Sequence, residues 1–530
     1  MDEDVVEAAL RGSARHLAAA RWSGCGGAEQ VEVHAIVPLF ERRGAFFFCA
    51  VLSFPPDPDL RFVSLVASPE RLAGPGPFRS AGMWFREAET TPEFVSFVVE
   101  SMRAGRTSAG DRGRVVWRMR ELPRGRAGRP EALGGDTSNA LVSFCIGRRR
   151  VVLKSYRRLD PFNPEPEMLA FLTERGARLA PRVLGEAFFE PAGGGQAATS
   201  SPSGAPGSPM VSRPPEEPAS LAPHHPEGGF PGGRPLCAAI LIEHIEGFPA
   251  LPAFVGNARR AIRRGLGHHT CVPGRLGMAL GELHSQLSST RAPPELRPGI
   301  IDRDDVARWR DEILGDYGRA VSALRGWRRR ELEAARGTVE EALLPMERWP
   351  GGLKIRTHQD MHLAQVLICP RGFRFLDFEG EPLRRGARRV ERLPPERDVA
   401  GMLRSFSYAS ALALRAARAG QGRGGRFPGK DAGEGAGGGE GEFHPTGASW
   451  REAEARAADW EKGVSDAFVE GYLSSCPRSV RRKGMRGLMV SVRVWMIQKA
   501  LYEILYEARH RPRLVDIPLR GLVSLLQAGS

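Results

Sequence analysis

The chain has 530 residues, which is too long for one hydrophobic core and predicts two or three domains. Its longest apolar runs fall far short of the roughly 20 residues that cross a bilayer, so we expect no transmembrane segment and no membrane contact. The formal net charge is +14, but only six of the 76 basic residues are lysine, and the arginines are spread along the chain without interleaved aromatic residues. This pattern argues against a nucleic-acid surface.

Cysteine usage and the first residues predict a cytoplasmic protein. The seven cysteines form no C-x-x-C pair, as expected for a reduced chain without disulfides or a zinc site. The opening letters MDEDVVEAAL are acidic where a secretory signal would be basic and then apolar. The sequence does not distinguish a monomer from a homodimer.

The predicted elements begin with an α+β domain that ends near residue 125. A first helix precedes strand-like apolar runs such as VEVHAIVPLF, GAFFFCAVLSF, RFVSLVAS and RVVWRMREL. Residues 138–190 have the pattern of strands followed by a helix, and the chain from about residue 257 has mainly helical periodicity. The stretches 191–235 and 420–447 are rich in Gly and Pro and can bury little apolar surface, so we predict two disordered insertions.

The first chemically informative cluster is the stretch HQDMHLAQ, from His358 to Gln365. Short apolar runs on both sides of the letters CPRG predict a β-hairpin directly after it. With the turn centred near Arg371, Gln365 would lie opposite Asp377, and Asp360 would be close by in the preceding loop. Carboxylate and carboxamide oxygens suit Mg²⁺ and do not suit zinc. The same order of groups, with the same five-residue step, occurs in kinase catalytic loops.

The two histidines of this stretch offer an alternative, a histidine-based metal site. Such a site would need further histidines nearby, and the remaining ten are dispersed along the chain. We therefore expect His358 to orient the loop through a hydrogen bond. His362 is expected either to pack or to contact the substrate.

A phosphate-binding lysine and its glutamate partner are expected before the first insertion. Lys154 ends the β-branched run of RRRVVLKSY, and Asn163 with Pro164 predicts the start of the next helix. Glu165 or Glu167 in its first turn is suited to pair with Lys154, and we favour Glu167. The alternative is that these acids only complement the helix N-terminus.

Two further segments are candidates for nucleotide binding. In GGDTSNALVSF, Ser138 and Asn139 belong to a glycine-bearing turn that enters a strand, where backbone N–H groups could hold phosphates. In AAILIEHIEG, Glu243 and Ile245 follow an apolar strand at the place expected for an adenine-binding hinge. Core packing is the alternative for most of this second run.

With both clusters in place, the chain resembles the maltokinases, bacterial members of the aminoglycoside-phosphotransferase-like kinase superfamily. The matching text includes HQDMHLAQVL, FLDFEGEP, RDVAGMLRSFSYAS, KALYEILYEARHRP, VVLKSYRRLDPFNPEPE and LGELHSQL. It extends from about residue 134 to the C-terminus outside the two insertions. The resemblance implies an α+β, bilobal protein-kinase-like fold, with a cap domain at 1–125, a β-rich N-lobe at 126–245 and a mainly helical C-lobe at 246–530.

The resemblance also implies ATP-dependent phosphorylation of maltose to maltose 1-phosphate for α-glucan synthesis, with trehalose synthase as a candidate partner. It assigns Asp360 as the catalytic base, and Gln365 and Asp377 as Mg²⁺ ligands. It assigns Lys154 to the α- and β-phosphates of ATP. Asp398 would anchor the catalytic loop, unless it serves only as a helix N-cap.

The sugar site implied by the resemblance lies on a C-terminal helix. Steps of three and four place Lys499, Tyr502 and Tyr506 on one helix face, where they would contact a disaccharide; core packing of the aromatic residues is the alternative. Two letters depart from the family pattern, which usually has glycine at Gln359 and asparagine at His510. The two insertions are also atypical of the family.

Two other functions stay open at this point. The first is a related small-molecule kinase that acts on another sugar or on an aminoglycoside. The second is a nucleotide-binding pseudokinase that regulates a glucan-synthesis partner. The presence of Lys154, Asp360, Gln365 and Asp377 argues against the second.

Overall fold

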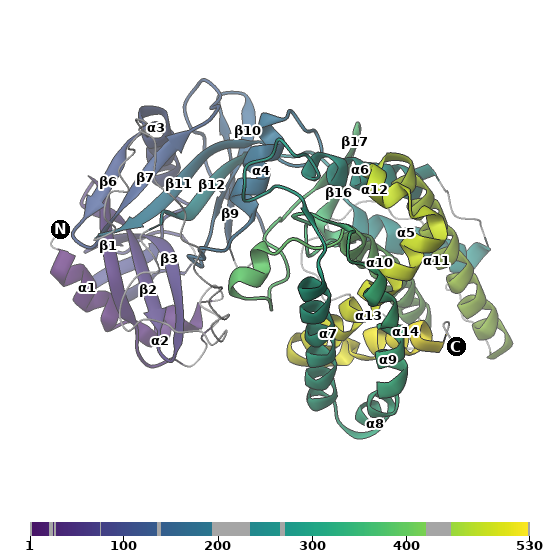
Figure 1. The fold of residues 1–530 in the computed structure, drawn as a ribbon. Helices are drawn as coiled ribbons and strands as arrows, with labels where there is room; N and C mark the ends of the chain where they lie inside the picture. The colour runs from purple at the N-terminus through teal and green to yellow at the C-terminus, as the bar shows by residue number, and fades with distance from the viewer. Residues whose placement is uncertain are drawn as a thin grey trace, which may run out of the picture. The chain divides into compact units, whose positions relative to one another are not determined.

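The computed structural model describes residues 3–20, 25, 28–74, 76–134, 139–192, 234–265, 271–419 and 447–527 (Figure 1). Most of both predicted insertions lies outside these described residues. The chain divides into a β-rich unit, residues 1–161 with 184–242, and a helical unit, residues 162–183 with 243–530. The predicted division into three domains stays a prediction. Among the described residues, no helix is long and apolar enough to cross a membrane.

The β-rich unit begins with two helices and a five-stranded antiparallel sheet in the order β1-β2-β3-β5-β4. Its elements are α1 (Glu3–Arg11), α2 (Ala14–Ala19), β1 (Glu32–Arg42), β2 (Ala45–Phe54), β3 (Asp57–Ser68), β4 (Phe78–Ser80) and β5 (Met83–Glu87). Successive side chains of a strand point to opposite faces. Phe46 and Phe48 therefore pack with α1 and α2, whereas Phe47 and Cys49 enter a second core. This two-sided burial explains the unbroken apolar run of β2.

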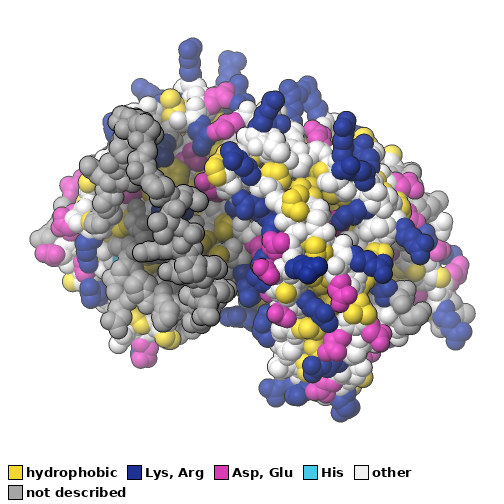
Figure 2. All heavy atoms as spheres, in the orientation of Figure 1, with side chains coloured by type: hydrophobic (Ala, Val, Ile, Leu, Met, Phe, Trp, Pro, Cys, Tyr) yellow, Lys and Arg dark blue, Asp and Glu magenta, His cyan; other side chains and the backbone are white. Residues whose placement is uncertain are grey.

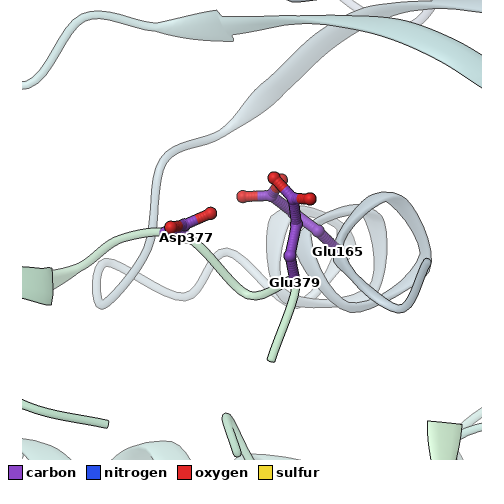
Figure 3. Close-up of side chains that lie close together, drawn as sticks. All are labelled: Glu165, Asp377 and Glu379. Carbon is purple, nitrogen blue, oxygen red and sulfur yellow. The ribbon is translucent and has the colours of Figure 1, made fainter. Parts of the chain in front are cut away.

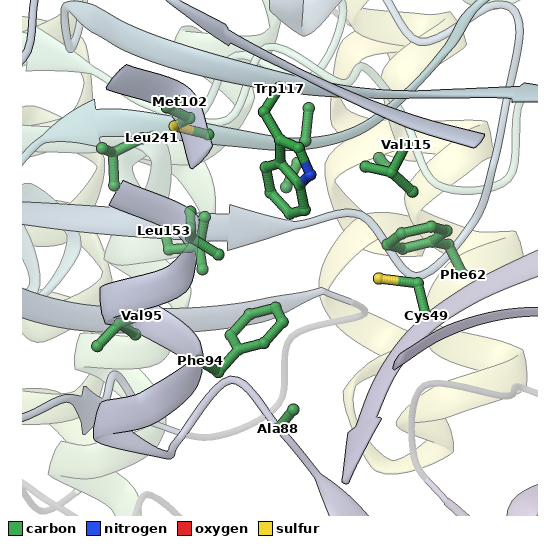
Figure 4. Close-up of a cluster of buried hydrophobic side chains, with 14 of the residues drawn as sticks. Cys49, Phe62, Ala88, Phe94, Val95, Met102, Val115, Trp117, Leu153 and Leu241 are labelled. Atoms are coloured by element: carbon green, nitrogen blue, oxygen red, sulfur yellow. The ribbon is translucent and has the colours of Figure 1, made fainter. Parts of the chain in front are cut away.

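The second core lies between this sheet and a seven-stranded sheet in the order β6-β7-β11-β12-β10-β9-β8, and Figure 4 shows part of it. The elements are α3 (Pro92–Ala104), β6 (Thr107–Gly110), β7 (Gly113–Met119), β8 (Glu131–Ala132), β9 (Ala140–Ile146), β10 (Arg149–Ser155), β11 (Val183–Pro191) and β12 (Leu236–Glu243). Strands β6 and β7 come from the predicted cap region but pair in the sheet that carries Lys154. The cap and the following strands therefore share one core.

The helical unit contains eleven α-helices among the described residues. They are α4 (Glu165–Glu174), α5 (Ala250–Arg264), α6 (Cys271–Leu287), α7 (Arg303–Ala323), α8 (Gly326–Ala334), α9 (Arg336–Ala342), α10 (Glu396–Ala419), α11 (Gly447–Ser475), α12 (Arg478–Arg481), α13 (Gly484–His510) and α14 (Asp516–Gln527). Its strands are β13 (Phe248–Pro249), β14 (Gly299–Ile300), β15 (Leu353–Lys354), β16 (Val366–Cys369) and β17 (Gly372–Phe375). The short 3₁₀ helices are η3 (Leu344–Arg348), η4 (Leu363–Gln365), η5 (Gly386–Val390) and η6 (Pro512–Leu514). Figure 2 shows Lys and Arg distributed over one face and interspersed with acids.

Helices α6 and α11 approach backbone to backbone because α6 has glycines at the contact. A Cβ atom on Gly277 would lie 1.9 Å from the carbonyl oxygen of Phe468, and one on Gly281 would lie 2.2 Å from Ser475 Oγ. No side chain fits at Gly277 without a shift of the backbone of α11. This close contact brings His284 of α6 within hydrogen-bond distance of Tyr472 of α11.

We predict that Gly277→Ala destabilises the protein by on the order of 1–3 kcal/mol, because the new methyl group overpacks the contact. Thermal and urea unfolding would measure the change. The control is Gly318→Ala in α7, where a Cβ atom meets nothing within 4 Å. This control should be neutral or stabilising by up to about 1 kcal/mol, because alanine is the better helix former. Equal effects of the two substitutions would contradict the proposed contact.

Candidate active site

Residues 358–365 form a loop, called the catalytic loop below, that the N-terminal turn of α10 holds in place. Asp398 accepts the backbone N–H groups of His358 at 2.7 Å and of Gln359 at 3.0 Å. Burial opposes ionisation of Asp398, but His284 and His358, including the His358 N–H, hold the pKa of its carboxyl below the ordinary value. Asp398 anchors the catalytic loop, as the family resemblance implied.

The LGELHSQL motif supplies a second support for this anchor. His284 is fully buried, with Nε2 3.1 Å from Asp398 Oδ2 and Nδ1 3.0 Å from the Tyr472 hydroxyl. A carboxylate accepts only, so Nε2 donates to Asp398, while Nδ1 shares a hydrogen bond with the hydroxyl. Burial also keeps the pKa of Tyr472 well above its usual range, so this hydroxyl keeps its proton. The loop is therefore tied to α6 and α11 through Asp398.

The two histidines of the catalytic loop have different roles. His358 is buried, and its Nε2 lies 2.8 Å from the carbonyl oxygen of Leu376 in the segment after β17. Burial lowers the pKa of His358, so a neutral ring that donates this hydrogen bond is expected. This confirms the orienting hydrogen bond. His362 accepts the N–H of Ala364 with Nδ1, and its Nε2 lies 3.5 Å from Asp360 Oδ2.

Each carboxylate oxygen of Asp360 lies close to a side-chain nitrogen of another residue. Lys499 donates to Oδ1 at 2.9 Å, and His362 faces Oδ2. Burial would raise the pKa of Asp360, but the Lys499 ammonium and His362 hold it well below the usual range. The carboxylate is therefore ionised at neutral pH.

The predicted hairpin is confirmed, with β16 and β17 paired antiparallel. Its predicted register is wrong by one residue. Cys369 pairs with Gly372 across a two-residue turn, and Leu376 donates its N–H to the carbonyl of Gln365 at 2.9 Å, so Gln365 lies opposite Leu376. The side chains still meet, because Gln365 Nε2 donates to Asp377 Oδ2 at 3.1 Å. Asp377 has a φ of 62°, a left-handed conformation that aspartate tolerates better than most residues.

Three carboxylates gather at Asp377 (Figure 3). One oxygen each from Glu165, Asp377 and Glu379 lies within 4.8 Å of the other two. The N–H of Phe378 donates to Glu165 at 3.2 Å, which brings the start of α4 against this segment. Hard oxygen donors at this spacing, with the Gln365 amide beside them, fit Mg²⁺ in character. Neither Glu165 nor Glu379 was predicted from the sequence to lie at the metal, although both stand in acidic stretches of the matching motifs.

Helix α4 begins at Glu165, directly after the predicted Asn163 and Pro164. Pro164 is the N-cap residue, and Asn163 Oδ1 accepts the N–H of Glu165 at 3.1 Å. Glu165 is only 2% exposed, whereas Glu167 is exposed. Of the two glutamates left open by the sequence, Glu165 is therefore the one that meets the Asp377 segment.

Lys154 lies in β10 of the β-rich unit, and α4 belongs to the helical unit, so the pairing of Lys154 with either glutamate stays a prediction. Lys154 is buried, and its ammonium lies 5.4 Å from the centre of the Tyr156 ring. This is a cation–π distance.

The predicted nucleotide-binding residues of the two other segments have the following positions. Ser138 lies outside the described residues. Asn139 Oδ1 accepts the N–H of Arg157 at 3.3 Å, so this side chain ties the start of β9 to the end of β10. Glu243 is the last residue of β12 and donates its N–H to the carbonyl of Arg182 at 3.0 Å. Ile245 follows in a half-buried segment without regular structure. Their roles in nucleotide binding stay predictions.

The predicted face of α13 is present. The ammonium of Lys499 lies 4.7 Å from the centre of the Tyr502 ring, and the Tyr502 and Tyr506 rings are stacked with centroids 6.4 Å apart. The His510 ring lies 4.7 Å from that of Tyr506. Tyr502 is only 7% exposed, so most of its ring area serves packing. The sugar-binding role of this face stays a prediction.

Glu381, which was not predicted from the sequence to be a site residue, is the centre of a buried charge cluster. It is 0% exposed and accepts from Lys499 at 2.9 Å, Arg397 at 2.6 Å and Arg384 at 2.8 Å. Burial alone would raise the pKa of Glu381, but the three cations lower it to about 2. Arg397 also donates to the carbonyl of Gln359 at 3.1 Å, so the cluster reaches the catalytic loop.

No protein-family model matches the chain. A glucosamine kinase from Mycolicibacterium smegmatis is 25% identical over 265 residues, which is 48% of this chain and 53% of that protein. A glucosamine kinase from Streptacidiphilus jiangxiensis is 24% identical over 188 residues, which is 34% of this chain and 41% of that protein. The chain thus spans about half, or less, of the length of these curated relatives.

One similar solved structure is a glucosamine kinase in complex with glucosamine, ADP and inorganic phosphate. It has a TM-score of 0.61 and 17% sequence identity, and the match covers 99% of both chains. This likeness confirms the α+β kinase-like fold with a β-rich first part and a helical second part. The two curated relatives and the solved structure are glucosamine kinases and not maltokinases.

We predict that Glu381→Gln loses stability in a pH-dependent manner. The pKa of Glu381 falls from 4.5 to about 2 on folding, so its ionised form stabilises the fold above pH 4.5. That contribution, about 3 kcal/mol, is lost as the pH falls toward 2. Urea unfolding should show a large difference between wild type and variant at neutral pH, and this difference should shrink as the pH falls from 4.5 toward 2.

The control for this experiment is Glu340→Gln in α9, where a surface glutamate pairs with Arg336. A surface ion pair contributes at most about 1 kcal/mol, so the control should unfold much like wild type at each pH. A stability difference for Glu381→Gln that stays constant with pH would contradict the pKa assigned to Glu381.

Proposed function

We propose that this protein transfers the γ-phosphoryl group of ATP to a hydroxyl group of a small sugar. The observation that carries the proposal is the convergence of the catalytic loop with Asp377. Asp360, Gln365 and Asp377 belong to one loop and the hairpin that follows it. Their order along the chain is that of a kinase catalytic site, and the fold likeness to a glucosamine kinase covers 99% of the chain.

In the proposed reaction, Asp360 orients the acceptor hydroxyl. The hydroxyl oxygen bonds to the γ-phosphorus, the bond from that phosphorus to the leaving oxygen of ADP breaks, and the hydroxyl proton passes to Asp360. The low pKa of Asp360 makes it a weak base. A weak base is sufficient because phosphoryl transfer has a loose transition state in which little negative charge is demanded of the nucleophile.

The residues around Asp377 fit Mg²⁺ as the ion that accompanies ATP. Gln365 and Asp377 are the proposed ligands, and the carboxylates of Glu165 and Glu379 add negative charge beside them. When bound, Mg²⁺ would neutralise charge on the phosphates. Asp360 has no such role, because Lys499 and His362 already occupy its surroundings.

Residues earlier in the chain supply the proposed contacts to the rest of ATP. Lys154 is the proposed partner of the α- and β-phosphates. Ser138 and Asn139 are proposed to contact phosphates through the chain that enters β9, and Glu243 with Ile245 is proposed to line the adenine site. Glu167, favoured from the sequence, is the proposed partner of Lys154, with Glu165 as the alternative.

Glucosamine is the first acceptor to test, and maltose is the second. The curated relatives are glucosamine kinases, which supports an amino sugar. Maltose is the acceptor implied by the maltokinase resemblance, and with it come maltose 1-phosphate, α-glucan synthesis and a trehalose synthase partner. The α13 face supports maltose less strongly, because Lys499 already pairs with two carboxylates.

We predict ADP release from Mg·ATP in the presence of glucosamine or maltose, with a kcat/KM at least about tenfold above that for kanamycin. Glucose and trehalose complete the panel, and ³¹P NMR would identify the sugar phosphate. Equal rates with every acceptor would contradict a sugar-specific site. If no sugar were phosphorylated, the kinase proposal itself would be wrong.

We predict that Asp360→Asn lowers kcat by about 10² to 10⁴, because the amide cannot accept the hydroxyl proton. The KM for ATP should change little, since Asp360 faces the acceptor. The matched control is Asp466→Asn on α11, an exposed aspartate paired with Lys462. Near wild-type turnover in Asp360→Asn would rule out the role given to Asp360.

A further inference from the structure

The ammonium of Lys499 bridges two carboxylates that come from different parts of the chain. It lies 2.9 Å from Asp360 Oδ1 in the catalytic loop and 2.9 Å from Glu381 Oε1 in the segment after β17. Its side chain is only 10% exposed. A lysine that mainly donates to sugar hydroxyls would direct its N–H groups toward solvent and ligand, and here two of its three donors are already used.

Glu381 holds Lys499 in this position. Its second oxygen, Oε2, accepts from Arg397 at 2.6 Å and from Arg384 at 2.8 Å. Arg384 in turn pairs with Glu312 on α7 at 3.2 Å. Glu381 cannot turn toward solvent without breaking these buried bonds, so Oε1 stays directed at Lys499. A buried group held on both sides is preorganised, and its position does not depend on a bound sugar.

The bridge fixes the orientation of the Asp360 carboxylate. With Oδ1 bonded to Lys499 at 2.9 Å, Oδ2, which His362 faces at 3.5 Å, is the more open oxygen for an acceptor hydroxyl. Without the ammonium, Asp360 would lose its fixed rotamer and would share a buried region with the unpaired Oε1 of Glu381. The acceptor hydroxyl would then lack a defined partner, although the sugar and ATP could still bind.

We infer that Lys499 is a positioning residue that acts on the reaction through Asp360, with Glu381 as its support, and is not primarily a sugar ligand. This inference rests on the proposed kinase activity. It predicts a loss in kcat, whereas a sugar ligand would mainly affect the KM for the sugar. It also predicts that Lys499 matters only while Asp360 is present.

The test is a double-mutant cycle with Asp360→Asn and Lys499→Met, measured with the acceptor that wild type prefers. Lys499→Met alone should lower kcat by about 10²-fold or more, with the KM for ATP changed by less than about threefold. In the Asp360→Asn background the same substitution should change kcat by less than about threefold, because the residue it acts through is already disabled. Equal losses in both backgrounds, or a rise in sugar KM at unchanged kcat, would overturn the inference.

Two further variants separate positioning from folding. Lys499→Arg keeps the charge and should retain more activity than Lys499→Met by about tenfold. If Lys499→Met does not fold, Lys499→Gln replaces it, since glutamine is polar and carries no charge. The matched control is Lys462→Met, an exposed lysine on α11 that should leave kinetics and melting temperature unchanged. A wild-type protein that phosphorylates no sugar would instead overturn the proposed function, and this inference with it.

Discussion

The carboxylate of Asp398 accepts the backbone N–H groups of His358 and Gln359, and the position of the catalytic loop depends on these two hydrogen bonds. Backbone N–H groups buried without a partner are costly, so this stretch has few alternative conformations. The carboxylate is itself fixed by His284, which Tyr472 holds from α11. The packed helices therefore hold the loop in one position, as the proposed phosphoryl transfer requires.

Arg397, the neighbour of Asp398, links this anchor to the charged residues behind the loop. It donates to the carbonyl of Gln359 and to Glu381. The first turn of α10 therefore bonds to both N–H and carbonyl groups of the catalytic loop, and it also bonds to the segment that follows Asp377. Lys499 completes the connection by joining Glu381 to Asp360. The buried charges are tolerable because every carboxylate here meets cations at hydrogen-bond distance. Removing one partner would leave an uncompensated charge, so these residues are expected to act as one unit.

Local sequence patterns predicted the local structure well, but they did not predict which side chains from distant parts of the chain pair with each other. The strand-like runs and the Pro/Gly turn predicted the β16–β17 hairpin. The turn has two residues, so the strand register differs by one residue from the predicted register. The periodicity of apolar residues does not determine the length of such a turn. The contact of Lys499 with Asp360 joins residues 139 positions apart, and nothing in either segment specifies it. The exposure of Glu167 and burial of Glu165 depend on how α4 packs against the Asp377 segment. Which of the two acids meets the Asp377 segment could therefore not be predicted from the sequence.

Gln359 shows how a residue other than glycine is accommodated in a left-handed backbone conformation. Its φ of 67° favours glycine, the residue expected at this place from the maltokinase resemblance, and costs another residue roughly 1–2 kcal/mol. The side chain offsets this cost, because Nε2 donates to the carbonyls of Arg389 at 3.0 Å and Glu391 at 3.1 Å. Two such hydrogen bonds contribute about as much as the backbone strain removes. Gln359 therefore keeps the loop conformation that glycine would adopt freely. Its side chain also bonds the loop to Arg389 in η5 and to Glu391 directly after η5.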